Sequence, residues 1–141
     1  MNTDKNLEIE THATTEEALA EYPEKELTGN ILRGAFAVHN VLGAGFLERV
    51  YSNALAVELA RQRLTFVQNQ QLQVIYRDVI VGDYVADVIV ENRVILELKA
   101  CASLDPSHNA QLMNYLRATK IRVGLLINFG RPKPEYRRFV C

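Results

Sequence analysis

Two short apolar segments separated by three polar residues constrain this 141-residue chain more than any other feature of its sequence. Residues 84–90 and 94–99 are rich in β-branched and aliphatic side chains, which predicts a buried β-hairpin. Yet the first segment contains Asp87, and the second contains Glu97 and Lys99. Because a buried charge is costly unless it is paired or bound to a metal, the fold must provide partners for these three groups.

The length of the hairpin loop decides which of these side chains face each other. If Glu91-Asn92-Arg93 is the whole loop, Asp87 lies opposite Glu97, and any loop with an odd number of residues keeps both carboxylates on one face. Opposed carboxylates repel unless a cation lies between them, and their oxygens suit Mg²⁺ or Mn²⁺. Lys99 shares a strand face with Glu97 and could hold a water or stabilise charge on a phosphate. Two other interpretations stay open: a buried lysine–carboxylate cluster that satisfies itself, and an edge strand whose charges face water.

The rest of the chain alternates between helical and extended patterns. Apolar residues recur at helical spacing over residues 28–42 and 47–63, and Gly43-Ala44-Gly45 joins these two predicted helices. A third helix is predicted from the N-cap Asp105, followed by Pro106, to Thr119. Strands are predicted at residues 72–76, 84–90, 94–99, 123–129 and 137–140 (the last as an edge strand), with a short strand and a turn at residues 79–83. The order ααβββαβ predicts an α/β fold with a mixed β-sheet flanked by helices.

Charge is distributed unevenly, although the whole chain carries only −1. Residues 1–26 hold eight acidic and two basic residues, which predicts a flexible acidic N-terminal segment ahead of a folded domain at residues 27–141. The remainder carries +5, which suits either a polyanionic partner or an ordinary solvated surface. The same two interpretations apply to the basic residues near the C-terminus, which are Arg117, Lys120, Arg122, Arg131, Lys133, Arg137 and Arg138.

Composition excludes several classes of protein. The longest apolar run, at residues 123–127, is far shorter than the ~18 residues that a membrane span needs. The first five residues lack the basic and apolar regions of a secretory signal. Two cysteines, Cys101 and Cys141, are too few for a disulfide framework or a zinc site. We therefore expect a cytoplasmic protein with reduced thiols and no membrane association.

The charged hairpin also resembles the core of a nuclease superfamily. Asp87, followed ten residues later by Glu97-Leu98-Lys99, resembles the motif of the PD-(D/E)XK nucleases, with Ala86 in place of the proline. Residues 45–51, Gly-Phe-Leu-Glu-Arg-Val-Tyr, resemble the motif that names the GxxExxY family, a branch of that superfamily. The similarity extends in order and spacing over residues 28–140. It implies a restriction-endonuclease-like mixed sheet flanked by helices.

The resemblance implies a role for each matching residue. Asp87 and Glu97 would bind a divalent metal, with the Leu98 carbonyl as a further ligand. Lys99 would be the catalytic lysine, and Glu48 would complete the metal site.

Other candidates have structural explanations beside the functional ones. Gln111 matches an accessory glutamine of several branches and would support Lys99 or the attacking water. Glu48 also stands in a first helical turn, where an acid interacts favourably with the helix dipole. Tyr51 lies on the same helix face and suits packing with a hydrogen-bonded hydroxyl as well as a site role. His108 lies one turn before Gln111, at a position where a histidine commonly caps the helix rather than acts in catalysis.

These features together predict a Mg²⁺- or Mn²⁺-dependent phosphodiesterase that hydrolyses nucleic acid, with DNA favoured. The alternative is a non-catalytic nucleic-acid-binding or protein-interaction module that retains the nuclease fold. A third interpretation is a subunit that acts with a second copy or another protein. No DNA-reading motif is recognisable, so little sequence specificity is expected.

Overall fold

The computed structural model describes residues 7–9 and 22–141, and in this part of the chain three helices and six strands form an α/β fold around one mixed sheet. The elements are β1 (Leu7–Ile9), α2 (Lys25–Leu42), α3 (Glu48–Arg61), β2 (Phe66–Tyr76), β3 (Val79–Val90), β4 (Val94–Lys99), α4 (Pro106–Thr119), β5 (Val123–Asn128) and β6 (Glu135–Val140). The strands lie in the order β1-β6-β5-β4-β3-β2, with β4 and β5 parallel and the other pairs antiparallel. The predicted fold class is confirmed.

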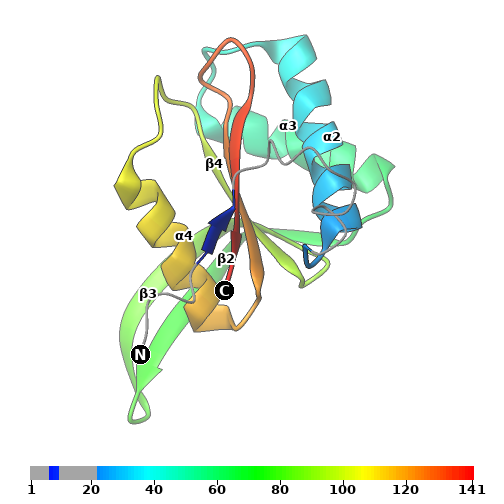
Figure 1. The fold of residues 1–141 in the computed structure, drawn as a ribbon. Helices are drawn as coiled ribbons and strands as arrows, with labels where there is room; N and C mark the ends of the chain where they lie inside the picture. Colours follow the sequence, from blue (N-terminus) through cyan, green and yellow to red (C-terminus); the bar gives the residue numbers. More distant parts are fainter. Residues whose placement is uncertain (1–6, 10–21) are drawn as a thin grey trace.

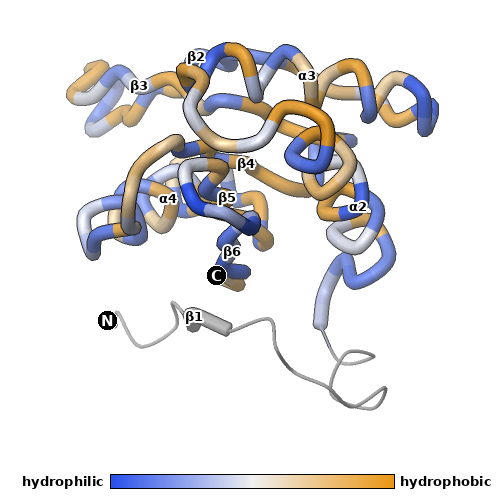
Figure 2. Tube along the Cα trace, turned by 90° about the horizontal axis from the view of Figure 1, so that it is seen from above, coloured by the Kyte–Doolittle hydropathy of each residue, from blue (hydrophilic) through white to orange (hydrophobic). Residues whose placement is uncertain are grey.

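Helices cover both faces of the sheet (Figures 1 and 2). α2 and α3 pack on one face, where Ile31 and Leu55 share a core with Leu96 of β4. α4 packs on the other face, where Leu112 shares a core with Ile95 of β4. Successive residues of β4 therefore point to opposite cores, as the alternation of a strand requires. None of the helices in the described residues combines the length and apolar character needed to cross a bilayer.

The loop between β3 and β4 has the predicted length of three residues. Val90 pairs with Val94 across it. Glu91 and Asn92 adopt positive φ angles of 53° and 54°, which lets the chain reverse direction tightly. The odd loop length therefore sets the register that the sequence analysis assumed.

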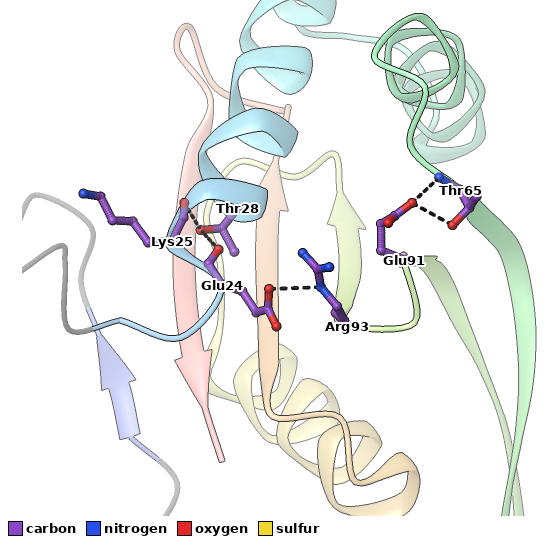
Figure 3. A network of polar contacts seen from close by, with 6 residues as sticks. All are labelled: Glu24, Lys25, Thr28, Thr65, Glu91 and Arg93. Atoms are coloured by element: carbon purple, nitrogen blue, oxygen red, sulfur yellow. Dashed lines mark hydrogen bonds and ion pairs between the residues drawn. The ribbon is translucent and has the colours of Figure 1, made fainter.

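Side chains fasten this loop on both sides (Figure 3). The Glu91 carboxylate accepts hydrogen bonds from the backbone N–H and the hydroxyl of Thr65 at 2.6 and 2.7 Å, and these bonds lower the pKa of Glu91. Arg93 Nε lies 3.1 Å from Glu24 Oε1, just before α2 begins. The loop is thus held between the start of α2 and the segment that leads into β2.

One predicted turn is wrong. β3 is continuous from Val79 to Val90, so Gly82-Asp83 lies within a strand instead of at a turn. The chain turns at Arg77-Asp78, whose φ angles are 49° and 67°. Glycine and asparagine are the usual residues for such angles, so this Arg-Asp pair carried no turn signal.

The predicted edge strand at the C-terminus is also wrong in one respect. β6 pairs on its outer side with β1, where Ile9 lies opposite Arg138, so β6 is not the edge of the sheet. β1 falls within the predicted acidic N-terminal segment, residues 1–26, and α2 also begins within it, at Lys25. The other residues of that predicted N-terminal segment, 1–6 and 10–21, lie outside the described residues.

β2 and β3 extend beyond the rest of the sheet as a two-stranded ribbon, visible in Figure 1, which we call the arm (residues 71–85). Gln71 pairs with Val85 at its base, and Tyr76 pairs with Val79 at its tip. Pairing of β3 with β4 begins only at Val88, so among the described strands the arm has no third neighbour.

Candidate active site

β3 and β4 separate at the positions of the two predicted carboxylates. Backbone pairing of the hairpin ends at Val88 and Leu96, while β4 continues to pair with β5. Beyond that point each carboxylate bonds to the backbone of the opposite strand. Asp87 N–H donates to Glu97 Oε2 at 2.9 Å, and Leu98 N–H donates to Asp87 Oδ2 at 2.7 Å. The structure therefore brings Asp87 and Glu97 together. We call these two carboxylates and the neighbouring Lys99 the fork.

Burial and repulsion within the fork raise the pKa values of both carboxyl groups. Glu97 is 3% exposed, and burial, followed by the negative charge of Asp87, raises its pKa to about 8. Burial also raises the pKa of Asp87, against the lowering effects of the Leu98 N–H and the Lys99 ammonium. The charge of Glu48 raises the pKa of both groups. Ionising both carboxyl groups is therefore costly even with Lys99 nearby, and an added cation would favour their ionised forms.

Strand alternation shows which way the β4 side chains point. Leu96 and Leu98 belong to the core beneath α2 and α3, whereas Ile95 belongs to the core beneath α4. Glu97 and Lys99 therefore project on the α4 side, and they share a face as predicted. β4 lies between β3 and β5, so the interpretation of an exposed edge strand is wrong.

Asp87 also lines a cleft of about 550 Å³ on the α3 side of the fork. Glu48 at the start of α3, Leu98 of β4 and Gln68 of β2 contribute to its walls. The Gln68 amide donates to Asn53 Oδ1 at 3.0 Å, which ties β2 to α3 across the cleft. Glu48 and Asp87 thus line the same cleft.

The donor chemistry of the fork fits a small divalent cation. Asp87 and Glu97 each have one carboxylate oxygen outside the backbone hydrogen bonds described above. Mg²⁺ and Mn²⁺ prefer carboxylate oxygens, commonly use only one or two of them, and keep several waters. Within the described residues, no group of three or more His, Cys, Asp or Glu side chains converges on one point. Glu48 therefore shares the cleft without forming a three-acid cluster with Asp87 and Glu97.

Tyr51 has a structural role in this arrangement. Its side chain is fully buried and stacks on Phe129 with 4.6 Å between ring centroids. Its hydroxyl donates to the Gly43 carbonyl at 2.5 Å and accepts from the Phe46 N–H at 3.2 Å. Gly45, between these two contacts, has a φ of 116°, which glycine adopts without strain. Tyr51 thus fixes the loop that leads into α3 and its cleft-facing glutamate.

His108 takes the capping role. Asp105 is the N-cap of α4 with Pro106 at the first helical position, as predicted. Ser107 N–H donates to Asp105 Oδ1 at 2.6 Å, and Asp105 N–H donates to His108 Nδ1 at 3.2 Å. The imidazole is therefore used to satisfy a free backbone group at the helix end. It does not line the cleft.

Gln111 is linked to the fork through a residue that the sequence analysis overlooked. It forms a hydrogen bond with Tyr115, one turn later on α4. Tyr115 is 3% exposed, and burial, followed by the charges of Glu97 and Asp87, raises its pKa to about 12. The available signal was the spacing of four residues between Gln111 and Tyr115, which places both on one helix face.

Asn128 is a second residue that the sequence analysis missed. It is fully buried at the end of β5, directly beside Lys99 in the parallel pairing. Its Oδ1 accepts from the N–H groups of Cys101 and Gly130 at 3.0 Å, and its Nδ2 donates to the Cys101 carbonyl at 2.9 Å. The side chain thus fixes the backbone where the chain leaves β4.

Arg138 is not available to contact phosphate. It is 4% exposed, and its Nε and Nη1 have no hydrogen-bond partner among the described residues. Its guanidinium lies 5.4 Å from the centre of the Tyr22 ring. Burial lowers its pKa.

Comparison with known proteins agrees with this geometry. The sequence model of a family described as the PD-(D/E)XK nuclease superfamily matches residues 25–139. Neither curated proteins nor solved structures give a match. The matched range includes the fork, the cleft and all three helices of the described residues, arranged on the mixed sheet in a restriction-endonuclease-like fold. On this evidence, the chain belongs to the PD-(D/E)XK nuclease superfamily.

Proposed function

We propose that this protein is a nuclease that hydrolyses phosphodiester bonds of DNA with Mg²⁺ or Mn²⁺. The observation that carries this proposal is the fork, where a buried and a half-buried carboxylate lie beside one lysine and next to a cleft. A lysine–carboxylate cluster that satisfied itself would hold the pKa values of its acids down. In the fork they are raised, that of Glu97 to about 8, chiefly by burial, so Lys99 does not offset the cost of ionising both acids. Active sites are where such perturbed groups concentrate.

Each fork residue has a role in this proposal. Asp87 and Glu97 would hold the cation, with the Leu98 carbonyl as a further ligand and Glu48 acting from the cleft wall. When bound, the divalent ion would lower the pKa of a water and neutralise the scissile phosphate. Lys99 would orient the attacking water or stabilise negative charge on the phosphate.

Gln111 would act as a positioning residue. Its hydrogen bond holds Tyr115, whose pKa responds to the charges of Glu97 and Asp87. Replacing Gln111 would therefore alter the electrostatics of the fork without removing a ligand.

We also place the protein in the GxxExxY branch of the superfamily, because each residue of that motif has a purpose in the structure. Gly45 adopts a positive φ, Glu48 faces the cleft, and Tyr51 fixes the loop between them. The cleft is open and has polar amide groups such as those of Gln68 and Asn69 on its walls. Such groups suit a phosphate-sugar backbone, which agrees with cleavage of low sequence specificity.

The decisive experiment compares two aspartates of the same strand. Asp87→Asn retains an oxygen that can accept the Leu98 N–H but removes the negative charge. Asp83→Asn, four residues away on the exposed arm, is the matched control. Labelled single- and double-stranded DNA and RNA are incubated with Mg²⁺ or Mn²⁺, with EDTA as the metal-free reference, and Mn²⁺ binding is measured by calorimetry.

We expect DNA cleavage that EDTA abolishes, that Asp87→Asn lowers by at least about 100-fold, and that Asp83→Asn leaves unchanged. Asp87→Asn should also weaken Mn²⁺ binding. If the wild type neither cuts any substrate nor binds Mn²⁺, the nuclease proposal is wrong, and the non-catalytic module takes its place. Cleavage of RNA alone would overturn the choice of DNA.

A further inference from the structure

The arm exposes an unusual amount of apolar surface. Eight of its side chains are 36–61% exposed: Val74, Ile75, Tyr76, Val79, Ile80, Val81, Tyr84 and Val85. Because successive residues of a strand point to opposite faces, these side chains give both faces of the ribbon an apolar character. Apolar patches above a few hundred Å² on a monomer mark interaction surfaces.

The arm also ends the sheet with an unprotected edge. β2 is the outermost strand, so one side of its backbone has no strand partner within the described part of the chain. From Phe66 to Tyr76 the strand contains no charged residue and no proline. Lysines, prolines and very short strands are the usual devices that prevent an edge from pairing with another chain. β2, with 11 residues, has none of these three, and its irregularities are a positive φ of 56° at Asn69 and a register shift at Val74/Ile75.

The charges of the arm argue against nucleic acid as its partner. Between residues 71 and 85 the only ionisable acids and bases are Arg77, Asp78 and Asp83, with one positive and two negative charges. A surface that binds phosphates needs an excess of lysine and arginine. A neutral, apolar strand is instead complementary to another strand of the same kind, and a second copy of this chain supplies one.

We propose that the arm joins two copies of this protein about a two-fold axis, with β2 of one copy pairing antiparallel to β2 of the other. Antiparallel pairing brings the tip of each β2 to the root of its counterpart. A groove of about 620 Å³ lies at that root, and Phe66, Val67, Leu72 and Ile89 contribute to its walls. In this arrangement Tyr76 of the second copy would lie against the groove, whose walls combine these apolar residues with polar ones such as Gln70 and Thr119. Both copies use the same residues, as a two-fold interface requires.

Single charge substitutions on the arm test this interface. Ile75→Lys places a charge on the edge strand itself, and Ile80→Lys places one on the cross-strand neighbour of Ile75. Both positions are more than half exposed, so neither change disturbs the core. The matched control is Val57→Lys on α3, where the valine is 58% exposed, compared with 61% for Ile75. Mass is measured by light scattering, and folding of each variant is checked by circular dichroism.

We expect the full-length wild type and Val57→Lys to have twice the chain mass of 16.0 kDa, and both arm variants to be folded monomers. Backbone amides of residues 66–76 should exchange faster after about 100-fold dilution of the wild type, because dilution dissociates a dimer. A monomeric wild type overturns the proposal, as does a dimer that both arm variants retain. Slow exchange of these amides only when DNA is added would assign the arm to nucleic acid instead. None of these measurements depends on nuclease activity.

Discussion

The two halves of β3 differ in burial in a way that inverts the ordinary distribution of residues. From Val79 to Val85 the strand is mostly apolar and mostly exposed, whereas from Ala86 to Val90 it is buried apart from the half-buried Asp87. Apolar residues usually lie inside and charges outside. Placing an acid inside and apolar side chains outside both cost free energy, and the requirements of folding alone do not explain either arrangement. The half-buried acid belongs to the proposed active site, and the exposed apolar ribbon belongs to the proposed interface between two copies.

Neighbouring elements account for the difference. The buried half is flanked by β2 and β4 and covered by helices on both faces, while the arm is a ribbon of two strands. A two-stranded ribbon is marginally stable by itself in water. The arm therefore depends on the body, or on a second copy, for its order.

The largest expected difference between the fork and the arm is in the rate of DNA cleavage. Lys99→Met removes the cation of the fork, and we expect cleavage to fall by about 100- to 1,000-fold, the usual cost of losing a group that stabilises charge in the transition state. Ile75→Lys on the arm should leave cleavage within a few-fold, because no arm residue lines the cleft. Lys133→Met, in the exposed loop before β6, controls for loss of a positive charge. Equal losses in Lys99→Met and Lys133→Met would contradict the role of Lys99.

The next largest difference between the buried core and the arm is in how much a substitution lowers the free energy of unfolding. Ile95→Ala empties a fully buried position beneath α4 and should lower the free energy of unfolding by about 2–5 kcal/mol. Ile80→Ala, at a site that is 54% exposed on the arm, should change it by no more than about 0.5 kcal/mol. Urea denaturation at low protein concentration measures both. Comparable losses would show that the arm is integrated into the core.

A third test uses pH in metal-free buffer. The carboxyl group of Glu97 has a pKa of about 8 in the folded protein and 4.5 as its ordinary value, so it releases a proton on unfolding between these limits. The free energy of unfolding should therefore fall as pH rises from 4.5 to 8. Glu97→Gln should reduce this slope, and Mg²⁺ should stabilise the wild type most at the upper end. If the free energy of unfolding of the wild type and of Glu97→Gln changed with pH in the same way, the raised pKa of Glu97 would be contradicted.

The smallest effect is expected at the hairpin turns. The loop at the buried end is fastened by the Arg93–Glu24 pair, whose members are partly exposed. Arg93→Ala should lower the free energy of unfolding by about 0.2–1 kcal/mol, and salt should reduce the difference. Urea denaturation at low and high salt measures it. A loss that does not respond to salt would indicate that packing of the arginine stem, and not its charge, is what the substitution removes.

Sequence patterns predicted the buried parts of this molecule well because burial imposes clear spacing. The three-residue loop after Val90, the N-cap at Asp105 and the apolar strand from Val123 were confirmed. The turn at Arg77-Asp78 was missed because arginine rarely adopts positive φ and neither glycine nor asparagine marks the position, and an exposed ribbon has no inside and outside to set a period. β1 was missed because three residues carry too little pattern.

The candidate site was only partly predictable, for a different reason. Asp87, Glu97 and Lys99 could be recognised because charges inside apolar strands are conspicuous. Asn128 and Tyr115 look like ordinary core residues in the sequence, and their importance comes from contacts between elements far apart in the chain. His108 and Tyr51 were candidates by position, and the structure shows a cap and a packed ring.

The reciprocal bonds of the fork have a consequence for how such a chain changes over time. Asp87 and Glu97 each accept a backbone N–H from the opposite strand, and an amide oxygen would do this equally well. Asparagine and glutamine would also avoid the cost of placing two ionisable acids close together in a poorly solvated site. A lineage that needed only the architecture could therefore drift to amides at both positions and become more stable. The two acids of this chain therefore differ from amides in the charge and the metal affinity that they can supply, and not in the backbone hydrogen bonds that they accept.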